Sequence, residues 1–210
     1  MQDQQIEIAA AELYDPAMPY HNFNHARYVA GEAARIVDKC RTEHVAIDAD
    51  TVYYAALFHD AGYHWDHMES GFETKEAYAA YLAEKPLREA GIGEETLAKV
   101  RDAILATHYA AHCASNEARA VRAADLSGLA ADYPVFKENA EKLRIEQEML
   151  GGDKIKWSAW KQRVRDNVEL YLHEDLHLTR DYFDENGESI FHKRAHANLE
   201  QLLADTSAPA

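Results

Sequence analysis

Apolar residues recur at helical spacing along almost the whole chain. From His25, the positions Val29, Ala33, Ile36 and Cys40 follow one another at steps of three or four residues, which places them on one face of a helix. Similar patterns predict helices at about 52–60, 73–83, 94–111, 118–131 and 190–203, and two longer helices on either side of Gly151 and Gly152. No segment alternates apolar and polar residues as a strand would, and no internal repeat is present. The sequence therefore predicts an all-α protein.

The breaks between these segments carry residues that start and stop helices. Asp48 and Asp50 precede the second segment as candidate N-terminal caps, and the third segment ends near Pro86. Gly151 and Gly152 form an expected turn. The helix after this turn carries an aromatic and aliphatic stripe, which we interpret as core rather than as a ligand site: Trp157, Trp160, Val164, Val168 and Tyr171.

Length, cysteine content and the first residues restrict the class of protein. With 210 residues the chain can bury a sizeable core, and we expect one domain, 1–210, in which a first helical layer gives way to a C-terminal one near Asp132. Cys40 and Cys113 show neither a disulfide framework nor a zinc spacing, which favours reduced thiols. The segment MQDQQIEIAA lacks a basic region followed by an apolar run, so no signal peptide is expected. These features predict a cytoplasmic protein.

The charge of the chain excludes several partners. The formal net charge is −15, and such a surface repels nucleic acid and anionic membranes. No apolar run approaches the roughly 20 residues of a membrane span. A small phosphate ester would also be repelled, unless a local cation reverses the field at the site. We therefore expect no nucleic-acid partner and no membrane partner.

Polar residues interrupt three of the apolar helix faces. Counting back from His59 by three, four and seven residues reaches only apolar residues, so the dipeptide His59–Asp60 ends a buried face. Asp125 has apolar residues four positions to either side, and His25 begins the first apolar stripe. An ionised carboxylate on such a face is costly unless something pairs with it.

Each of these residues alone has a simpler explanation than a site. A single buried histidine is more often a hydrogen-bonded core residue, and Asp125 alone suits a helix cap or a partner for Arg119 or Arg122. Three separate buried polar groups need a common explanation, and two imidazoles with two carboxylates form a mixed nitrogen and oxygen site. Such a set suits manganese, iron, cobalt, nickel or zinc, and a second, oxygen-rich position suits magnesium. The candidate ligands are His25, His59, Asp60 and Asp125.

The order His…His-Asp…Asp matches the HD superfamily of metal-dependent phosphohydrolases, which are all-α. Three local motifs resemble class I cyclic nucleotide phosphodiesterases. YHNFNHARYV resembles their Tyr-His-Asn-x-x-His-Ala segment, AALFHD their Ala-Ala-x-x-His-Asp, and AADLS their Ala-Asp-Leu-Ser. The resemblance covers Pro19 to Leu129, a little over half the chain.

This resemblance implies roles for the residues that match. His25, His59, Asp60 and Asp125 would be metal ligands, and Asp60 would bridge two metals where two are bound. His21 would donate a proton to the leaving oxygen; the alternative is that His21 is a helix-start residue in contact with solvent. The HD metal-site core would occupy about 19–130, followed by C-terminal helices of the same domain at about 134–205.

The chain also departs from the phosphodiesterases. Their further histidine, three residues after the aspartate of the His-Asp pair, is replaced by Tyr63, and His64 follows it. No glutamine has the context of their purine-reading residue, and this chain is much shorter than their catalytic domain. The resemblance therefore supports the metal site and not the cyclic nucleotide specificity.

Further polar residues are candidates for substrate contacts. His108 lies on the expected buried face of the 94–111 helix, and His112 is one turn further on. His64 follows the His-Asp turn in an acidic loop, which either lines the entrance to the site or is solvated. Lys75 is a candidate phosphate contact. Histidine pairs spaced by four occur late in the chain, and interhelical or surface packing explains them better than metal binding: His173 with His177 and His192 with His196.

We expect a metal-dependent hydrolase of a phosphate ester, a nucleotide in particular, that uses metal-activated water. The sequence does not distinguish a phosphomonoester from a phosphodiester, and it does not give the oligomeric state. Two alternatives stay open: an HD-type di-iron oxygenase, and a non-catalytic protein that binds a nucleotide or a metal.

Overall fold

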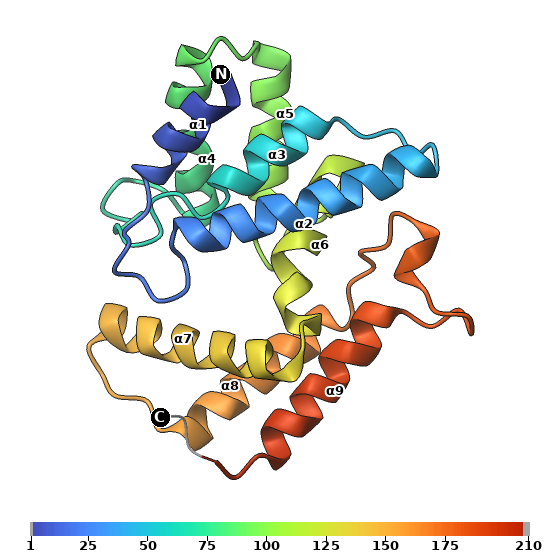
Figure 1. Ribbon diagram of the computed structural model, residues 1–210. Helices are drawn as coiled ribbons and strands as arrows, with labels where there is room; N and C mark the ends of the chain where they lie inside the picture. Colours follow the sequence, from blue (N-terminus) through green and yellow to red (C-terminus); the bar gives the residue numbers. More distant parts are fainter. Residues whose placement is uncertain (1, 208–210) are drawn as a thin grey trace. The chain divides into compact units, whose positions relative to one another are not determined.

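A computed structural model describes residues 2–207 of the chain, and this part is all-α, as expected (Figure 1). Among these residues β-pairing is limited to one isolated antiparallel bridge, between Phe183 and Ser189. No described helix combines the length and the apolar character needed to cross a bilayer. The α-helices are α1 (Gln2–Ala11), α2 (Phe23–Thr42), α3 (Ala49–Phe58), α4 (Lys75–Glu89), α5 (Glu94–Leu105), α6 (Asn116–Asp125), α7 (Tyr133–Gly151), α8 (Trp157–Tyr171) and α9 (Ile190–Ala204), and the short 3-10 helices are η1 (Leu126–Ala130) and η2 (Arg180–Tyr182).

The helices group into two compact units, with the division between Asp125 and Leu126. The N-terminal unit contains α1 to α6, and the C-terminal unit contains the remaining helices. Sequence analysis placed the change of layer near Asp132. In the structure it falls where α6 passes into η1, before the loop that leads to α7.

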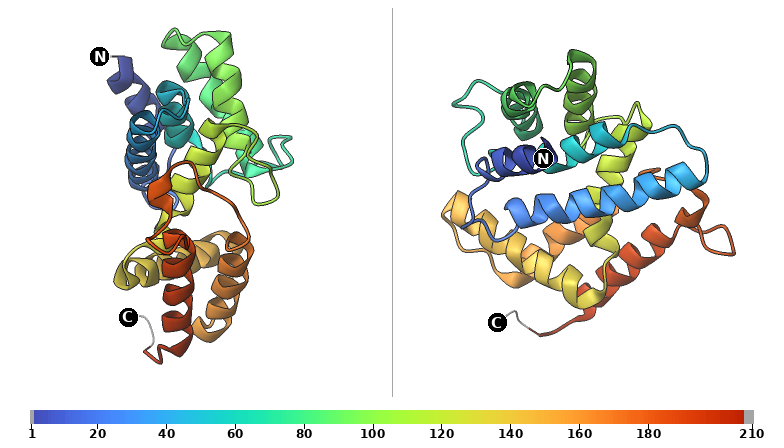
Figure 2. Two further views of the ribbon diagram at one scale, coloured as in Figure 1. Left: turned by 90° about the vertical axis from the view of Figure 1, so that its right-hand side faces the viewer. Right: turned by 45° about the horizontal axis from the view of Figure 1, so that its top comes forward.

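Helix α3 lies at the centre of the N-terminal unit. It contacts α2, α5, α6, α4 and α1, and the views of Figures 1 and 2 show it between α2 and α5. Most of its side chains are buried, from Thr51 and Val52 to Phe58. A helix that is apolar on all sides must be covered on all sides. The position of α3 therefore follows from its composition, and Asp48 caps it as expected by accepting hydrogen bonds from the amides of Asp50 and Thr51.

Helix α2 presents a narrower apolar face to this centre. Its N-cap is Asn22, whose side chain accepts hydrogen bonds from the amides of Asn24 and His25. The buried stripe begins at His25 as predicted, although Val37 rather than Ile36 is the buried residue at its turn. The cap and the stripe together fix where His25 points.

Three helix boundaries differ from the sequence prediction. Helix α4 continues through Pro86 to Glu89, because the fully buried Leu87 holds its last turn in the core. Helix α5 ends at Leu105 rather than near residue 111, and the predicted helix at 118–131 becomes α6 followed by the 3-10 turn η1. Helix α1 was not predicted, since among its described side chains only Ile6 and Ala10 are buried.

The buried Arg122 explains the early end of α5. Its guanidinium is 1% exposed, and it donates hydrogen bonds to the carbonyl oxygens of Ala106, His108, Tyr109 and Ala111 at 2.9–3.1 Å. In a continuing helix each of these carbonyls would point along the axis to the amide four residues on, whereas here all four converge on one cation. The segment after α5 therefore wraps around Arg122 as a loop.

The C-terminal unit forms around α7, α8 and α9, with η1 against α7 and α9. Three residues of the stripe predicted as core on α8 are buried, Trp160, Val164 and Val168, whereas Trp157 and Tyr171 are half-buried. The indole of Trp160 donates to the carbonyl of Ala140 at 2.7 Å. Gly152 ends α7 in the left-handed conformation, φ 77°, as the predicted turn requires.

Candidate metal centre

Three segments of the N-terminal unit bring the predicted ligands together. His25 lies in the first turn of α2, His59 is the C-cap of α3 and Asp60 follows it, and Asp125 is the last residue of α6. Because α2, α3 and α6 contact one another, these helix ends meet. The residues that sequence analysis selected from far-apart positions therefore form one cluster.

The donor atoms of this cluster converge. The Nε2 atom of His59 lies 2.9 Å from Oδ2 of Asp60 and 3.4 Å from Oδ1 of Asp125. The Nε2 atom of His25 lies 3.5 Å and 3.3 Å from the same two oxygens. Ligand atoms that share a cation about 2 Å away stand roughly 3 to 4 Å apart. The spacing of these atoms is compatible with a shared cation.

The ring orientation of His59 leaves its Nε2 atom available as a metal ligand. Its Nδ1 lies 2.9 Å from the carbonyl oxygen of Ala56, which can only accept a hydrogen bond. Nδ1 therefore carries a proton, and in the neutral imidazole Nε2 is the nitrogen with the lone pair. A backbone carbonyl that fixes the tautomer in this way is the usual partner of a metal-binding histidine.

A group of this kind can hold either a cation or a proton that His59 shares with the carboxylates. The Nε2 atoms of His25 and His59 are both buried without a hydrogen-bond partner, although carboxylate oxygens stand nearby. Buried polar atoms are usually satisfied, because leaving one unpaired costs free energy. The buried group of His25, His59 and Asp60 could hold a metal ion, with its ligand atoms all within 4.8 Å of one another.

The charges in the cluster perturb one another. Burial opposes protonation of His59, but the negative charges of Asp60 and Asp125 outweigh it and raise the pKa of the imidazole well above its usual value. Burial also opposes ionisation of Asp60, but the positive charges of His59 and His21 outweigh it and lower the pKa of this carboxyl to about 2. The pKa of Asp125 is lowered in spite of burial, chiefly by His59. A cation bound here would take the place of the proton on His59.

His21 lies beside the cluster and not within it. It precedes the N-cap Asn22 and is outside the helix. Its ring meets that of His25 edge-on, with centroids 5.8 Å apart, and it stacks on the ring of Tyr63 with centroids 3.7 Å apart. Its charge is one of the causes of the lowered pKa of Asp60, which reflects how near it is to that carboxylate.

The four predicted substrate contacts occupy different places. Lys75 begins α4, and its Nζ lies 3.3 Å from the centroid of the Tyr63 ring and donates to the carbonyl of Tyr63 at 3.1 Å. His64 is half-buried beside Trp65, with ring centroids 4.5 Å apart, and burial lowers the pKa of its imidazole. His112 is exposed in the loop after α5.

The prediction that His108 lies on the buried face of a helix was wrong. His108 falls in the loop around Arg122, where its Nδ1 accepts from the amide of Ala110 and its ring lies against Tyr109. The helix ends before it, so the periodicity that selected it does not apply. Neither His108 nor His112 belongs to the metal-ligand group found among the described residues.

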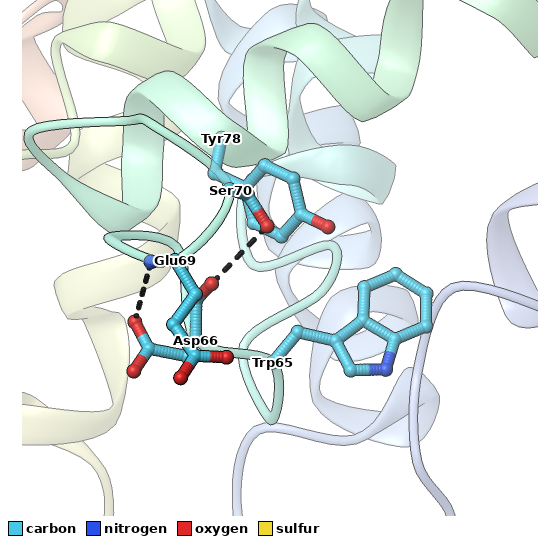
Figure 3. Close-up of a pocket in the computed structure, with 5 residues that line it drawn as sticks. All are labelled: Trp65, Asp66, Glu69, Ser70 and Tyr78. Carbon is cyan, nitrogen blue, oxygen red and sulfur yellow. Dashed lines mark hydrogen bonds between the residues drawn. The ribbon is translucent and has the colours of Figure 1, made fainter.

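A separate pocket lies in the loop that follows Asp60. Its volume is about 490 Å³, and Figure 3 shows its lining residues: Trp65, Asp66, Glu69, Ser70 and Tyr78. Asp66 organises the loop by accepting from the amide of Glu69 while its carbonyl accepts from the hydroxyl of Ser70. No ligand candidate of the cluster lines this pocket.

Sequence reasoning missed two tyrosines at this site. The hydroxyl of Tyr14 is buried and donates to the carbonyl of Leu57 at 2.9 Å, directly under the His-Asp turn. Tyr63 was noted only as a departure from the phosphodiesterase pattern, yet its ring covers that of His21. The signal for Tyr63 was its place after the His-Asp pair, where a functional group was expected.

No protein-family model matches the chain, and no curated protein matches it significantly. The function is therefore inferred from the chemistry of the cluster and its surroundings.

Proposed function

We propose that this protein is a metal-dependent phosphohydrolase of the HD type that acts on a small phosphate ester, a nucleotide in particular. One observation carries the proposal: two buried imidazole nitrogens without hydrogen-bond partners converge with two carboxylates. In this reading His25, His59, Asp60 and Asp125 hold a divalent transition metal, one of manganese, iron, nickel, cobalt or zinc. Asp60 has a second oxygen with which it would bridge to a further ion such as magnesium.

A bound cation would supply two things, a hydroxide nucleophile near neutral pH and positive charge for the oxygens of the phosphate. The second matters here because the formal net charge of the chain is −15, which otherwise repels a phosphate ester. The same charge favours a small substrate over a long polyanion, since repulsion accumulates along a nucleic acid.

The residues of the chain have distinct parts in this reaction. The Ala56 carbonyl keeps the proton of His59 on Nδ1, so that Nε2 faces the cluster. His21 would hold a proton beside the metal and transfer it to the leaving oxygen as the bond to phosphorus breaks. A proton donor must be near the substrate without being a ligand, and His21 lies outside the ligand group with its ring 5.8 Å from that of His25.

The test begins with the metal content of the purified protein, followed by turnover of phosphomonoesters and phosphodiesters of nucleosides with manganese, magnesium, nickel and iron. We expect bound metal and phosphate release that are both lost in Asp60→Asn. The matched control is Asp102→Asn, because Asp102 is an exposed aspartate of the same unit. A protein that binds metal but turns over no ester would contradict the proposal, and oxygen consumption with an iron pair would indicate the di-iron alternative.

A further inference from the structure

The ring of His21 is covered on one face by Tyr63. The two rings are nearly parallel, with an interplanar angle of 14° and centroids 3.7 Å apart. The other ring contacts of His21 are edge-on, to Tyr20 at 78° and to His25 at 84°. His21 precedes the first turn of α2, so helical hydrogen bonding does not fix its position. The parallel stack therefore restricts the plane of this imidazole.

Tyr63 is itself held from two sides. Its amide donates to the carbonyl of Asp60 at 3.1 Å, which closes the turn after the ligand pair. Lys75 donates to the carbonyl of Tyr63 at 3.1 Å and places its ammonium 3.3 Å from the ring centroid. Since His21 covers one face of the ring, the ammonium occupies the other, where it is attracted by the π electrons.

The turn that presents Tyr63 depends on Gly62. This residue has φ 72°, in the left-handed region, and its amide donates to the carbonyl of Leu13 at 2.9 Å. A Cβ at this position would lie 2.5 Å from Cδ1 of Leu82 and 3.0 Å from Cε3 of Trp65. The turn is therefore packed tightly enough to hold Tyr63 in one place relative to Asp60.

We propose that Tyr63 is a positioning residue for His21, and that Lys75 secures Tyr63 rather than binding the phosphate of the substrate. The ammonium of Lys75, the ring of Tyr63 and the imidazole of His21 form one stack. Through the turn at Tyr63 this stack connects Asp60 to His21. This inference rests on the proposed function, because it gives His21 a reason to be held precisely. Misplacing a reacting group by about 1 Å can cost on the order of 10²-fold in rate.

Three variants test separately the contributions of the Tyr63 hydroxyl, the Tyr63 ring and the Lys75 ammonium. Tyr63→Phe keeps the stack and should retain the rate within a few-fold. Tyr63→Leu removes the stack and should lose roughly 10- to 100-fold in kcat on an alkyl ester, with a much smaller loss on a nitrophenyl ester, since that leaving group needs no proton. Lys75→Met keeps an apolar stem over the ring and should show a loss in kcat between these two, with little change in KM. The control is Tyr81→Leu, because Tyr81 is an exposed tyrosine of α4, 59% exposed, and should leave both rates unchanged.

A measurement independent of turnover locates the His21 ring. In protein loaded with zinc, the carbon-bound protons of an imidazole stacked on a phenol resonate upfield, and His21→Asn identifies their signals by removing them. The upfield shift should persist in Tyr63→Phe and disappear in Tyr63→Leu, with metal content equal in both.

Each failure has a distinct meaning. A protein that hydrolyses no ester overturns the proposed function, while the spectrum still decides whether Tyr63 positions His21. The inference is overturned if Tyr63→Leu leaves the His21 signals in place, or keeps the alkyl-ester rate of the wild type in an active enzyme. It is overturned in its second part if Lys75→Met raises KM for the ester many-fold at constant kcat, because that is the behaviour of a phosphate contact.

Discussion

The two compact units hold carboxylates in opposite ways, buried in the C-terminal unit and half-buried in the N-terminal unit. In the C-terminal unit the buried Glu148 accepts hydrogen bonds from Arg144, from Lys154 and from the amide of Ile155, at 2.7–2.9 Å. In the N-terminal unit Asp60 and Asp125 face imidazole nitrogens that have no hydrogen-bond partner. Both arrangements are built from nearby helix ends and loops.

The difference is between a carboxylate that is surrounded by hydrogen-bond donors and carboxylates that face buried imidazole nitrogens. Glu148 is surrounded by donors, and its charge-assisted hydrogen bonds tie the end of α7 to the segment before α8. In the N-terminal unit, imidazole nitrogens and carboxylate oxygens converge on one point. This arrangement costs free energy unless a proton or a cation binds between them. The comparison predicts that changes at the two sites will have different consequences.

The largest expected effect is the loss of metal and hydrolysis on removing a ligand. His59→Ala and Asp60→Ala should each abolish both, since each deletes one donor from a small set. Glu148→Gln should leave metal content and rate unchanged although it also alters a buried acid. Metal analysis and a rate assay on each variant measure this, and a His59→Ala protein with full metal and activity would remove the distinction between the two sites.

The next effect concerns the proton donor. His21→Ala should keep its metal and lose roughly 10² to 10⁴ in rate on an alkyl ester, the usual scale for acid catalysis. The loss on a nitrophenyl ester should be far smaller, whereas His25→Ala should lose metal and be slow on both esters. Equal losses of His21→Ala on both esters, or the loss of its metal, would show that His21 is a ligand or a structural residue.

Metal removal should reduce the stability of the protein by a smaller amount. A metal present at 100 times its dissociation constant stabilises the folded state by about 2.7 kcal/mol, and chelation removes this gain. Asp125→Asn should lose most of the metal-dependent increment, because the amide is nearly the same size as the carboxylate but uncharged. Thermal melts with and without chelator measure the increment. An unchanged melting temperature on chelation would favour a salt-bridge or capping role for Asp125.

The smallest effect is a difference in pH dependence without metal. The pKa of Asp60 is lowered from 3.8 to about 2, so its contribution is present above pH 3.8 and is lost as the pH falls towards 2. The pKa of His59 is raised above 6.5, so its contribution is present below pH 6.5 and is lost as the pH rises through the folded value. Glu148 has a lowered pKa, so it contributes only to the loss of stability as the pH falls.

The metal-free protein should therefore lose stability on both sides of a window from about pH 4 to 6.5. His59→Gln should remove the alkaline decline, and Glu148→Gln should not. Denaturation midpoints measured across pH in the presence of chelator test this. An alkaline decline that persists in His59→Gln would assign it to another group.

Much of the fold, and the convergence of the candidate ligands, could be predicted because both depend on local periodicity. His25 and His59 continue apolar helix faces, and those faces are buried against one another, so the predicted ligands meet. The end of α5 could not be predicted, because it depends on Arg122 of α6. Its guanidinium donates hydrogen bonds to carbonyls 11 to 16 residues earlier in the chain. Periodicity contains no information about such a contact.

The stack on His21 was hidden for the same reason. Nothing in the spacing of His21 and Tyr63 indicates that their rings lie face to face, since the segment before α2 and the turn after α3 are both irregular. The position of Lys75 over the ring follows from where α4 begins, and periodicity predicts that boundary only approximately. Side chains that converge from helix faces are thus easier to predict than ring contacts between two irregular segments.

Gly62 has a consequence for how the sequence can vary. Gly71 also has a positive φ, 84°, but a side chain there would meet nothing within 4 Å, so asparagine is a tolerable replacement. At Gly62 the positive φ coincides with close contacts to Leu82, Trp65 and Tyr78, so any other residue combines an unfavourable backbone conformation with a displaced Leu82 side chain. In a library of all single substitutions selected for function, only glycine should therefore be recovered at position 62. Several residue types should be recovered at position 71, in the same loop.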